Sequence, residues 1–219
     1  MDKKSMLLKA ITDQGMLPLF FHADEQKSIN LTQTVYDAGV RVIEYTNRGK
    51  EALANFKKLK EVALVSMPEL KLGIGTIKTP EEAQQFIDAG ADFIVCPIVT
   101  PAVAKVCADA DMLWVPGCMT PTEISVAQQL GAGLIKIFPA NILGQEFLSS
   151  IKELFRGQLF MPTGGVDLSK ENISSWFKVG VCAVGMGSKL ISKDIMDNED
   201  YDLLTKNTKE VLALIQSIK

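Results

Sequence analysis

The 219-residue chain contains a single histidine, His22. A zinc site that takes several imidazole ligands is therefore excluded, and a serine nucleophile paired with a histidine base would have to use His22 itself. The sequence also lacks the nucleophile-elbow motif Gly-x-Ser-x-Gly. Chemistry on this chain must therefore depend mainly on lysine, carboxylate, arginine, hydroxyl or thiol groups.

The sequence also lacks an export signal, a membrane-spanning run and an excess of basic residues. The first ten residues have no long apolar stretch, and no apolar run reaches the roughly 18 residues of a transmembrane helix. The net charge is −3, so we expect neither nucleic acid nor a membrane as a partner. CxxC spacing is absent, so we expect a cytoplasmic protein with free buried thiols at Cys96, Cys107, Cys118 and Cys182.

Short apolar segments alternate with helical patterns along the chain. The predicted strands comprise residues 16–21, 40–45, 71–76, 93–96, 113–116, 134–137, 159–162 and 182–185. The predicted helices comprise residues 3–14, 24–37, 50–64, 80–88, 101–108, 122–130, 145–154 and 170–178. A polar linker over residues 197–200 precedes a last amphipathic helix that begins at Tyr201.

This alternation predicts an α/β fold. Eight nearly continuous apolar strands with intervening helices favour a (β/α)8 TIM barrel, here with a short N-terminal helix and an extra C-terminal helix. We expect one domain over residues 1–219. An open doubly wound sheet is the alternative, although no GxGxxG motif follows a strand.

Lys136 lies in the middle of the apolar strand at residues 134–137. Lysine is rarely buried without a partner or a task, so two interpretations are open. The amine could extend from a strand end into water. Alternatively, a desolvated amine is nucleophilic enough to form a Schiff base with a carbonyl compound.

The second predicted strand and its extension carry charged residues. Alternation puts Val42, Glu44, Thr46 and Arg48 on one face, where polar side chains are costly unless they serve one another or a ligand. One interpretation is a Glu44–Arg48 ion pair at the barrel mouth. The other is an acid/base carboxylate with an arginine that holds a substrate carboxylate.

Glycine-rich turns follow the last two predicted strands. Thr163, Gly164 and Gly165 follow one strand, and Gly187 and Ser188 follow the other. Barrels commonly bind phosphate in these two loops through backbone N–H groups, so the pair predicts a phosphate site. With Lys136 as the imine-forming amine and Glu44 as the proton carrier, the residues suffice for metal-free carbon–carbon bond cleavage.

These segments resemble the 2-keto-3-deoxy-6-phosphogluconate (KDPG) / 4-hydroxy-2-oxoglutarate (KHG) aldolases, in order from about Leu17 to Leu190. The matching segments are residues 40–48, 73–76, 116–117, 136–140, 162–165 and 187–188. The resemblance implies a class I aldolase, a lyase that needs no metal or cofactor. It implies a homotrimer that cleaves a small phosphorylated 2-keto acid, 2-dehydro-3-deoxy-6-phosphogluconate, to pyruvate and glyceraldehyde 3-phosphate, and also 4-hydroxy-2-oxoglutarate to pyruvate and glyoxylate.

The resemblance also implies roles by position. Lys136 corresponds to the Schiff-base lysine and Glu44 to the general acid/base. The residues implied at the substrate are Arg48, Thr76, Pro97, Phe138 and Thr163, and those implied at its phosphate are Gly164, Gly165, Gly187 and Ser188.

Three departures from the family pattern bear on specificity. Cys96-Pro97-Ile98 stands where Ser-Pro-Gly is usual, Asn47 stands where leucine is common, and the C-terminal extension is long. The phosphogalactonate epimer and a non-phosphorylated substrate therefore remain alternatives. A phosphosugar isomerase or decarboxylase and a non-catalytic phosphometabolite-binding protein on the same barrel are the other two classes.

Overall fold

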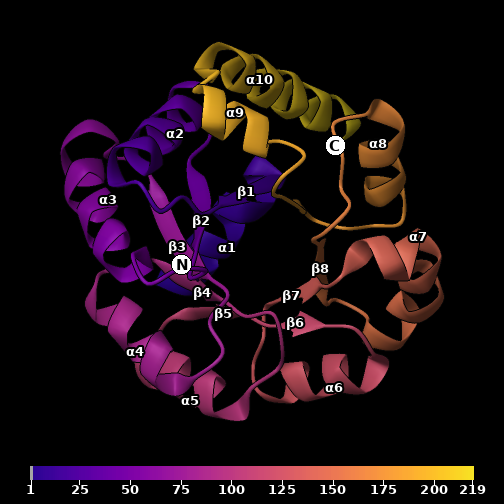
Figure 1. Ribbon diagram of the computed structural model, residues 1–219. Helices are drawn as coiled ribbons and strands as arrows, with labels where there is room; N and C mark the ends of the chain where they lie inside the picture. The colour runs from indigo at the N-terminus through magenta and orange to yellow at the C-terminus, as the bar shows by residue number, and fades with distance from the viewer. Residues whose placement is uncertain (1) are drawn as a thin grey trace.

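The computed structural model describes residues 2–219, which form an α/β fold with helices surrounding a curled parallel sheet (Figure 1). The strands are β1 (Met16–Phe20), β2 (Val42–Thr46), β3 (Lys71–Gly75), β4 (Phe93–Val95), β5 (Leu113–Val115), β6 (Gly117–Cys118), β7 (Leu134–Ile137), β8 (Leu159–Pro162) and β9 (Val184–Met186). The helices are α1 (Lys3–Gln14), α2 (Glu25–Asp37), α3 (Ala52–Ser66), α4 (Pro80–Asp88), α5 (Pro101–Asp109), α6 (Pro121–Gln129), α7 (Ala140–Ile151), η1 (Lys152–Phe155), α8 (Lys170–Lys178), α9 (Lys193–Asn198) and α10 (Tyr201–Ile218).

The strands pair in parallel in two groups. One has the order β5-β4-β3-β2-β1-β9, and the other has the order β6-β7-β8. Pro116 alone separates β5 from β6; it has no N–H to donate, but its carbonyl accepts a hydrogen bond of 2.9 Å from the N–H of Lys136. At the other junction, a parallel bridge joins Thr163, directly after β8, to Gly185 in β9. The two groups therefore approach each other at Pro116 and at the Thr163–Gly185 bridge.

The predicted strands and most predicted helices are confirmed within a few residues, and three predictions need correction. The expected eight strands become nine: the strand predicted at 113–116 is β5, and a further short strand, β6, follows it because Pro116 interrupts the ladder. The helix expected at 145–154 begins at Ala140 and contains a break at Gly144, whose φ is +71°. Only half of the expected linker at 197–200 joins two helices, because α9 extends to Asn198. Ser192 caps the first turn of α9 by accepting from the N–H of Ile195.

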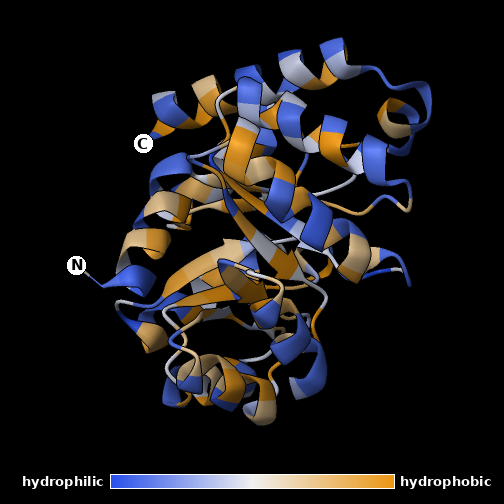
Figure 2. Ribbon diagram, turned by 90° about the vertical axis from the view of Figure 1, so that its left-hand side faces the viewer, coloured by the Kyte–Doolittle hydropathy of each residue, from blue (hydrophilic) through white to orange (hydrophobic). Residues whose placement is uncertain are grey.

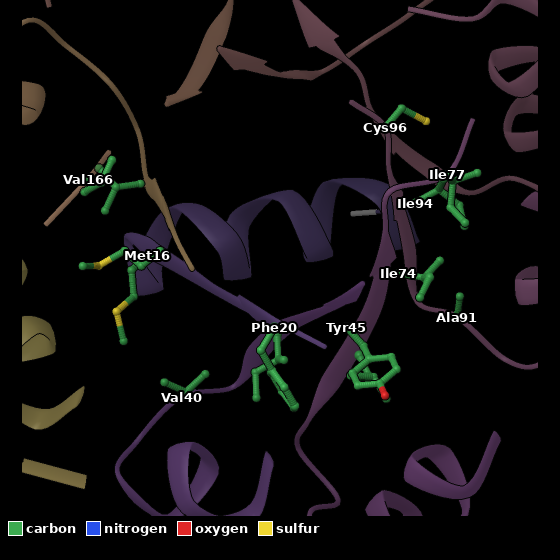
Figure 3. Close-up of a cluster of buried hydrophobic side chains, with 14 of the residues drawn as sticks. Met16, Phe20, Val40, Tyr45, Ile74, Ile77, Ala91, Ile94, Cys96 and Val166 are labelled. Carbon is green, nitrogen blue, oxygen red and sulfur yellow. The ribbon is translucent and has the colours of Figure 1, made fainter. Parts of the chain in front are cut away.

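Apolar side chains fill both faces of the curled sheet. An inner cluster contains alternate strand residues such as Leu17, Val42 and Leu134, together with Leu7 and Ile11 of α1. A larger outer cluster lies between the strands and the surrounding helices (Figure 3). The hydropathy colouring shows the same layering, with apolar strands inside and polar outer helix faces (Figure 2). The four cysteines are free, as predicted; Cys96, Cys107 and Cys118 are also buried as predicted, whereas Cys182 is only partly buried.

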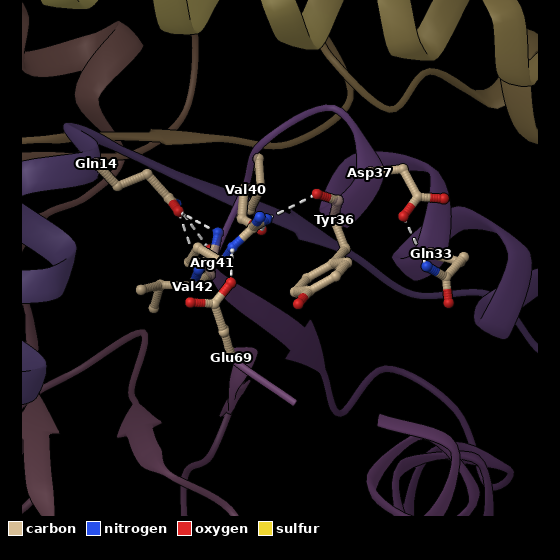
Figure 4. Close-up of polar contacts among 8 residues, drawn as sticks. All are labelled: Gln14, Gln33, Tyr36, Asp37, Val40, Arg41, Val42 and Glu69. Atoms are coloured by element: carbon tan, nitrogen blue, oxygen red, sulfur yellow. Dashed lines mark hydrogen bonds and ion pairs between the residues drawn. The ribbon is translucent and has the colours of Figure 1, made fainter. Parts of the chain in front are cut away.

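Helix α1 is fixed to the starts of β1 and β2. The Gln14 side chain donates to the carbonyls of Met16 and Val42 and accepts from the N–H groups of Arg41 and Val42 (Figure 4). This end of the sheet is therefore covered, while the carboxyl ends of the strands carry the loops with the predicted site residues. No helix in residues 2–219 has both the length and the apolar character needed to cross a membrane.

Candidate active site

Lys136 occupies the third position of β7, between Gly117 of β6 and Met161 of β8. Its neighbours Ile135 and Ile137 belong to the outer cluster, and Leu134 belongs to the inner cluster. Alternation therefore directs Lys136 to the interior of the curled sheet. The side chain is only 5% exposed and forms no ion pair or hydrogen bond with residues 2–219, and its Nζ lies 5.0 Å from the centre of the Phe138 ring. The Lys136 side chain is therefore buried in the interior instead of extending along the surface, while its Nζ keeps some exposure to solvent.

Glu44 lies on the same interior face, in β2. The residue is 1% exposed, and neither carboxylate oxygen has a hydrogen-bond partner within residues 2–219. Burial raises the pKa of Glu44, because desolvation disfavours the charged form, and the positive charges of Lys136 and Arg48 oppose this shift. A carboxyl group with a raised pKa exchanges protons more readily near neutral pH than an exposed one.

Arg48 belongs to a surface-accessible cavity rather than to an ion pair. No Glu44–Arg48 ion pair is present within residues 2–219, so the ion-pair interpretation of the second strand is wrong. The residue after Arg48 is tightly packed: a Cβ on Gly49 would lie 2.5 Å from Cζ of Phe21. The Phe21 ring also lies against Tyr45, with ring centroids 5.7 Å apart. These contacts fix the turn that carries Arg48.

The cavity has a volume of about 200 Å³ and opens at the carboxyl ends of β1, β2, β8 and β9. Seven of the eleven predicted site residues line it: Arg48, Phe138, Thr163, Gly164, Gly165, Gly187 and Ser188. Lys136 and Glu44 do not line it but are buried next to residues that do: Nζ of Lys136 lies 5.0 Å from the centre of the Phe138 ring, and Glu44 pairs with Leu19 in the sheet. The structure therefore brings the predicted amine, carboxylate, guanidinium and glycine turns into one region.

Thr76 and Pro97 do not line this cavity. Thr76 directly follows β3 and has a φ of +63°. This left-handed conformation costs energy for a β-branched residue. The preceding residue, Gly75, lies against the side chain of Glu44. The carbonyl oxygen of Pro97 lies 2.4 Å from the position that a Cβ on Gly117 would take. Pro97 is therefore packed against the strand beside Lys136, and its neighbour Ile98 is half exposed.

The two glycine turns present unpaired donors to the cavity. Within residues 2–219, the N–H groups of Gly165, Val166, Gly187 and Ser188 have no acceptor, and the Ser188 hydroxyl has no partner. Gly164 and Gly165 have φ of +94° and +74°, and a Cβ on Gly165 would lie 2.4 Å from Cβ of Asn141. Successive unpaired N–H groups in turns of this kind are typical of anion-binding nests.

Thr163 adds a buried hydroxyl at the same edge. Its Oγ1 has no hydrogen-bond partner within residues 2–219, and a Cβ on Gly185 would lie 2.2 Å from it. Buried polar groups are normally paired, so this unpaired hydroxyl is a candidate ligand contact.

Eight cavity residues were not predicted as site residues, among them Phe21, Lys189 and Met196. Lys189 directly follows Ser188, so its position next to the predicted phosphate turn was the signal that could have found it. Met196 comes from α9, a helix that was not predicted from the sequence. Phe21 follows β1, whose end carried no polar residue to mark it.

Comparisons with known proteins agree with this geometry. The sequence model of the KDPG and KHG aldolase family matches residues 8–207. The KHG/KDPG aldolase of Escherichia coli K12 is 28% identical over 205 residues, 92% of each chain, and a probable 2-dehydro-3-deoxy-6-phosphogalactonate aldolase of Rhizobium meliloti is 32% identical over 136 residues, 62% of this chain and 63% of the relative.

A solved structure extends the comparison to the fold. The KDPG aldolase of Legionella pneumophila, captured with pyruvate as a covalent carbinolamine intermediate, superimposes with a TM-score of 0.86 at 23% identity, covering 96% of this chain and 98% of the other. The family match spans most of the chain and contains the strands, the interior lysine and glutamate and both glycine turns. The chain belongs to the KDPG and KHG aldolase family of lyases.

Proposed function

We propose that this protein is a class I aldolase that cleaves 2-dehydro-3-deoxy-6-phosphogluconate to pyruvate and glyceraldehyde 3-phosphate. The observation that carries the proposal is the interior pair of Lys136 and Glu44. Both residues are buried, neither carboxylate oxygen of Glu44 has a hydrogen-bond partner, and Lys136 forms no ion pair within residues 2–219. Buried polar groups that lack partners destabilise a fold, so their presence calls for a task.

The reaction would begin at the amine. In its neutral form, Nζ of Lys136 adds to the C2 carbonyl of the keto acid to give a carbinolamine, and loss of water gives the iminium ion. Glu44 transfers the protons of these steps and then removes the proton of the C4 hydroxyl. The C3–C4 bond breaks, its electron pair moves toward the iminium nitrogen to form an enamine, and the aldehyde leaves.

Glu44 would then return its proton to the enamine carbon C3, which regenerates the iminium ion. Addition of water and loss of the amine release pyruvate and free Lys136. The raised pKa of Glu44 supports this role, because the group must hold a proton in one step and give it up in another. The Phe138 ring beside Lys136 would limit access of bulk water to the imine.

The surrounding residues would hold the two ends of the substrate. Arg48 would bind the carboxylate through a charged hydrogen bond. Gly164, Gly165, Gly187 and Ser188 would bind the phosphate, which the unpaired N–H groups of this nest support. The remaining proposed contacts to the keto-acid end are Thr76, Pro97, Phe138 and Thr163.

The relatives support the substrate class and leave alternatives within it. The Escherichia coli relative is named for both KDPG and 4-hydroxy-2-oxoglutarate, so we extend the proposal to 4-hydroxy-2-oxoglutarate. The Rhizobium relative is named for the phosphogalactonate epimer, which is the alternative substrate. The carbinolamine captured in the Legionella structure supports a covalent amine mechanism. If the borohydride test described below gives no adduct, a phosphosugar isomerase or a binding protein becomes the favoured alternative.

Two structural proposals accompany the function. We treat β5 and β6 as one strand interrupted at Pro116, so that the two sheet groups and the Thr163–Gly185 bridge make one closed (β/α)8 barrel over a single domain, residues 1–219. We also carry over the homotrimer from the family resemblance, and light scattering on the purified protein would test it.

Borohydride reduction in the presence of pyruvate tests the function. We expect a stable adduct on Lys136, located by peptide mass mapping, without added metal. Lys71→Ala, which removes an exposed lysine at the start of β3, is the matched control and should leave the adduct unchanged. A folded protein that forms no adduct would overturn the class I mechanism and favour the isomerase or binding-protein alternatives.

A further inference from the structure

The charges that line the cavity are all positive. Arg48 and Lys189 are the two charged side chains in its wall within residues 2–219, and no carboxylate lines it. The other lining residues are glycines, residues with a hydroxyl group, and apolar residues such as Phe21 and Met196. A cavity with this lining selects anionic ligands.

The two cations lie at separate strand ends. Arg48 follows β2 and Lys189 follows β9, and β1 lies between these strands in the sheet. Two strand spacings amount to about 10 Å, which suits a ligand with an anionic group at each end better than a single small anion.

Lys189 is not neutralised by the protein. It forms no ion pair within residues 2–219, although Asp167 is close enough that the positive charge of Lys189 contributes to lowering the pKa of that carboxyl. The larger causes of that lowered pKa are hydrogen bonds, because Asp167 accepts from the N–H of Ser169 at 2.8 Å and from its hydroxyl at 2.6 Å. Asp167 is therefore committed to Ser169, and the amine of Lys189 remains available next to the nest.

We infer that Lys189 is a second, charged ligand of the terminal phosphate and that it gives the site its preference for phosphorylated over non-phosphorylated keto acids. This inference rests on the proposed function and goes beyond it, because the nest alone offers neutral donors. An ammonium group adds a charged hydrogen bond to a phosphate that already accepts backbone N–H groups.

Binding of 3-phosphoglycerate and glycerate, which differ only by a phosphate group, tests the inference by calorimetry on the full chain. Lys189→Gln should weaken 3-phosphoglycerate binding about tenfold. This loss is at the lower end of the range for a charged hydrogen bond, because the Lys189 side chain is exposed. Lys189→Arg should restore most of the loss. Lys170→Gln, at the exposed start of α8 outside the cavity, is the control and should have no effect.

Kinetics supply the second arm. Lys189→Gln should lower kcat/KM for the phosphorylated keto acid about tenfold and change 4-hydroxy-2-oxoglutarate cleavage far less. The role of Lys189 would be overturned if Lys189→Gln weakened the phosphorylated and the non-phosphorylated ligand, or slowed the two substrates, by the same factor. A loss in Lys170→Gln as large as in Lys189→Gln would also overturn it. If the wild-type protein cleaved neither keto acid, the aldolase proposal would fail, and the 3-phosphoglycerate comparison would still decide whether Lys189 binds phosphate.

Discussion

The carboxylate of Glu44 occupies the space that a side chain on Gly75 would fill. A Cβ on Gly75 would lie 1.8 Å from Oε1 and 2.5 Å from Cδ of Glu44. Because real atoms cannot approach so closely, any larger residue at position 75 would displace the carboxylate. The glycine at the end of β3 therefore positions the group that we propose to carry protons.

Gly75→Ala should reduce kcat about 100-fold, the effect expected when a reacting group is moved by roughly 1 Å. The expected change in KM is small, because Arg48 and the phosphate turns stay in place. Gly133→Ala is the matched control, since the atom nearest to its added Cβ is Cδ2 of Leu8 at 3.5 Å. Wild-type kcat in Gly75→Ala would show that the position of Glu44 is unimportant for turnover.

Lys136→Ala should abolish turnover and the borohydride adduct while the fold persists. The amine has no hydrogen bond or ion pair within residues 2–219, so its removal breaks no structural contact of that kind. Far-UV circular dichroism checks the fold, and an aldehyde-coupled assay checks turnover. Retained activity in a folded Lys136→Ala protein would be incompatible with the Schiff-base mechanism.

Glu44→Gln should slow turnover by about 100- to 10,000-fold, the usual contribution of a general acid/base, and should still form some imine with pyruvate. Mass spectrometry after borohydride treatment measures the imine separately from turnover. A variant with unchanged kcat would assign proton transfer to another group.

The same variant should be more stable than the wild type above the titration range of Glu44. Burial raises the pKa of Glu44 above its ordinary value of 4.5, so just above pH 4.5 the folded chain retains a proton that the unfolded chain has lost. The free energy of unfolding of the wild type therefore falls as the pH rises through the interval between 4.5 and the raised pKa. Because glutamine cannot ionise, the free energy of unfolding of Glu44→Gln does not fall in this pH interval. Urea unfolding between pH 4 and 8 measures the free energy of unfolding of both proteins. The prediction is contradicted if the difference between these two free energies does not grow with pH.

Ser188→Ala should raise KM for a phosphorylated substrate about two- to tenfold, as expected for one neutral hydrogen bond, and should affect a non-phosphorylated substrate less. Steady-state kinetics with the two substrate types measure the difference. Ser149→Ala on the exposed face of α7 serves as the control. Equal changes for both substrates would remove Ser188 from the phosphate site.

Asn55→Ala should destabilise the fold by about 1–3 kcal/mol, because it removes a buried amide that donates three hydrogen bonds. The Asn55 amide donates to the carbonyls of His22 and Ala23 and to the Tyr45 hydroxyl, at 3.1, 3.0 and 3.3 Å. These bonds fix the loop after β1, next to Phe21 in the cavity wall. Ser66→Ala, an exposed helix position, should change the unfolding free energy by less than about 0.5 kcal/mol. Similar effects for the two variants in chemical denaturation would disprove the loop-fixing role.

Much of the fold and of the site followed from local patterns in the sequence. Alternation in residues 134–137 and 42–46 predicted the inward faces of Lys136 and Glu44, because successive side chains of a strand point to opposite sides. Thr79 and Thr120 form the capping boxes that begin α4 and α6, where a hydroxyl, a proline and a glutamate at fixed spacing satisfy the first backbone groups. These signals lie within a few residues of one another, so the order of elements and the polar strand ends were readable from the chain alone.

The tertiary structure decided which of these residues meet. No local pattern shows that the missing side chain of Gly75 leaves room for the carboxylate of Glu44. Nor does any local pattern show that Arg48, Lys189 and Met196 line one cavity. Thr76 and Pro97, predicted with the same motifs, lie outside that cavity. Local sequence determined the elements and the direction of their side chains, whereas sheet register and curvature, which depend on the packing of residues far apart in the chain, determined the site.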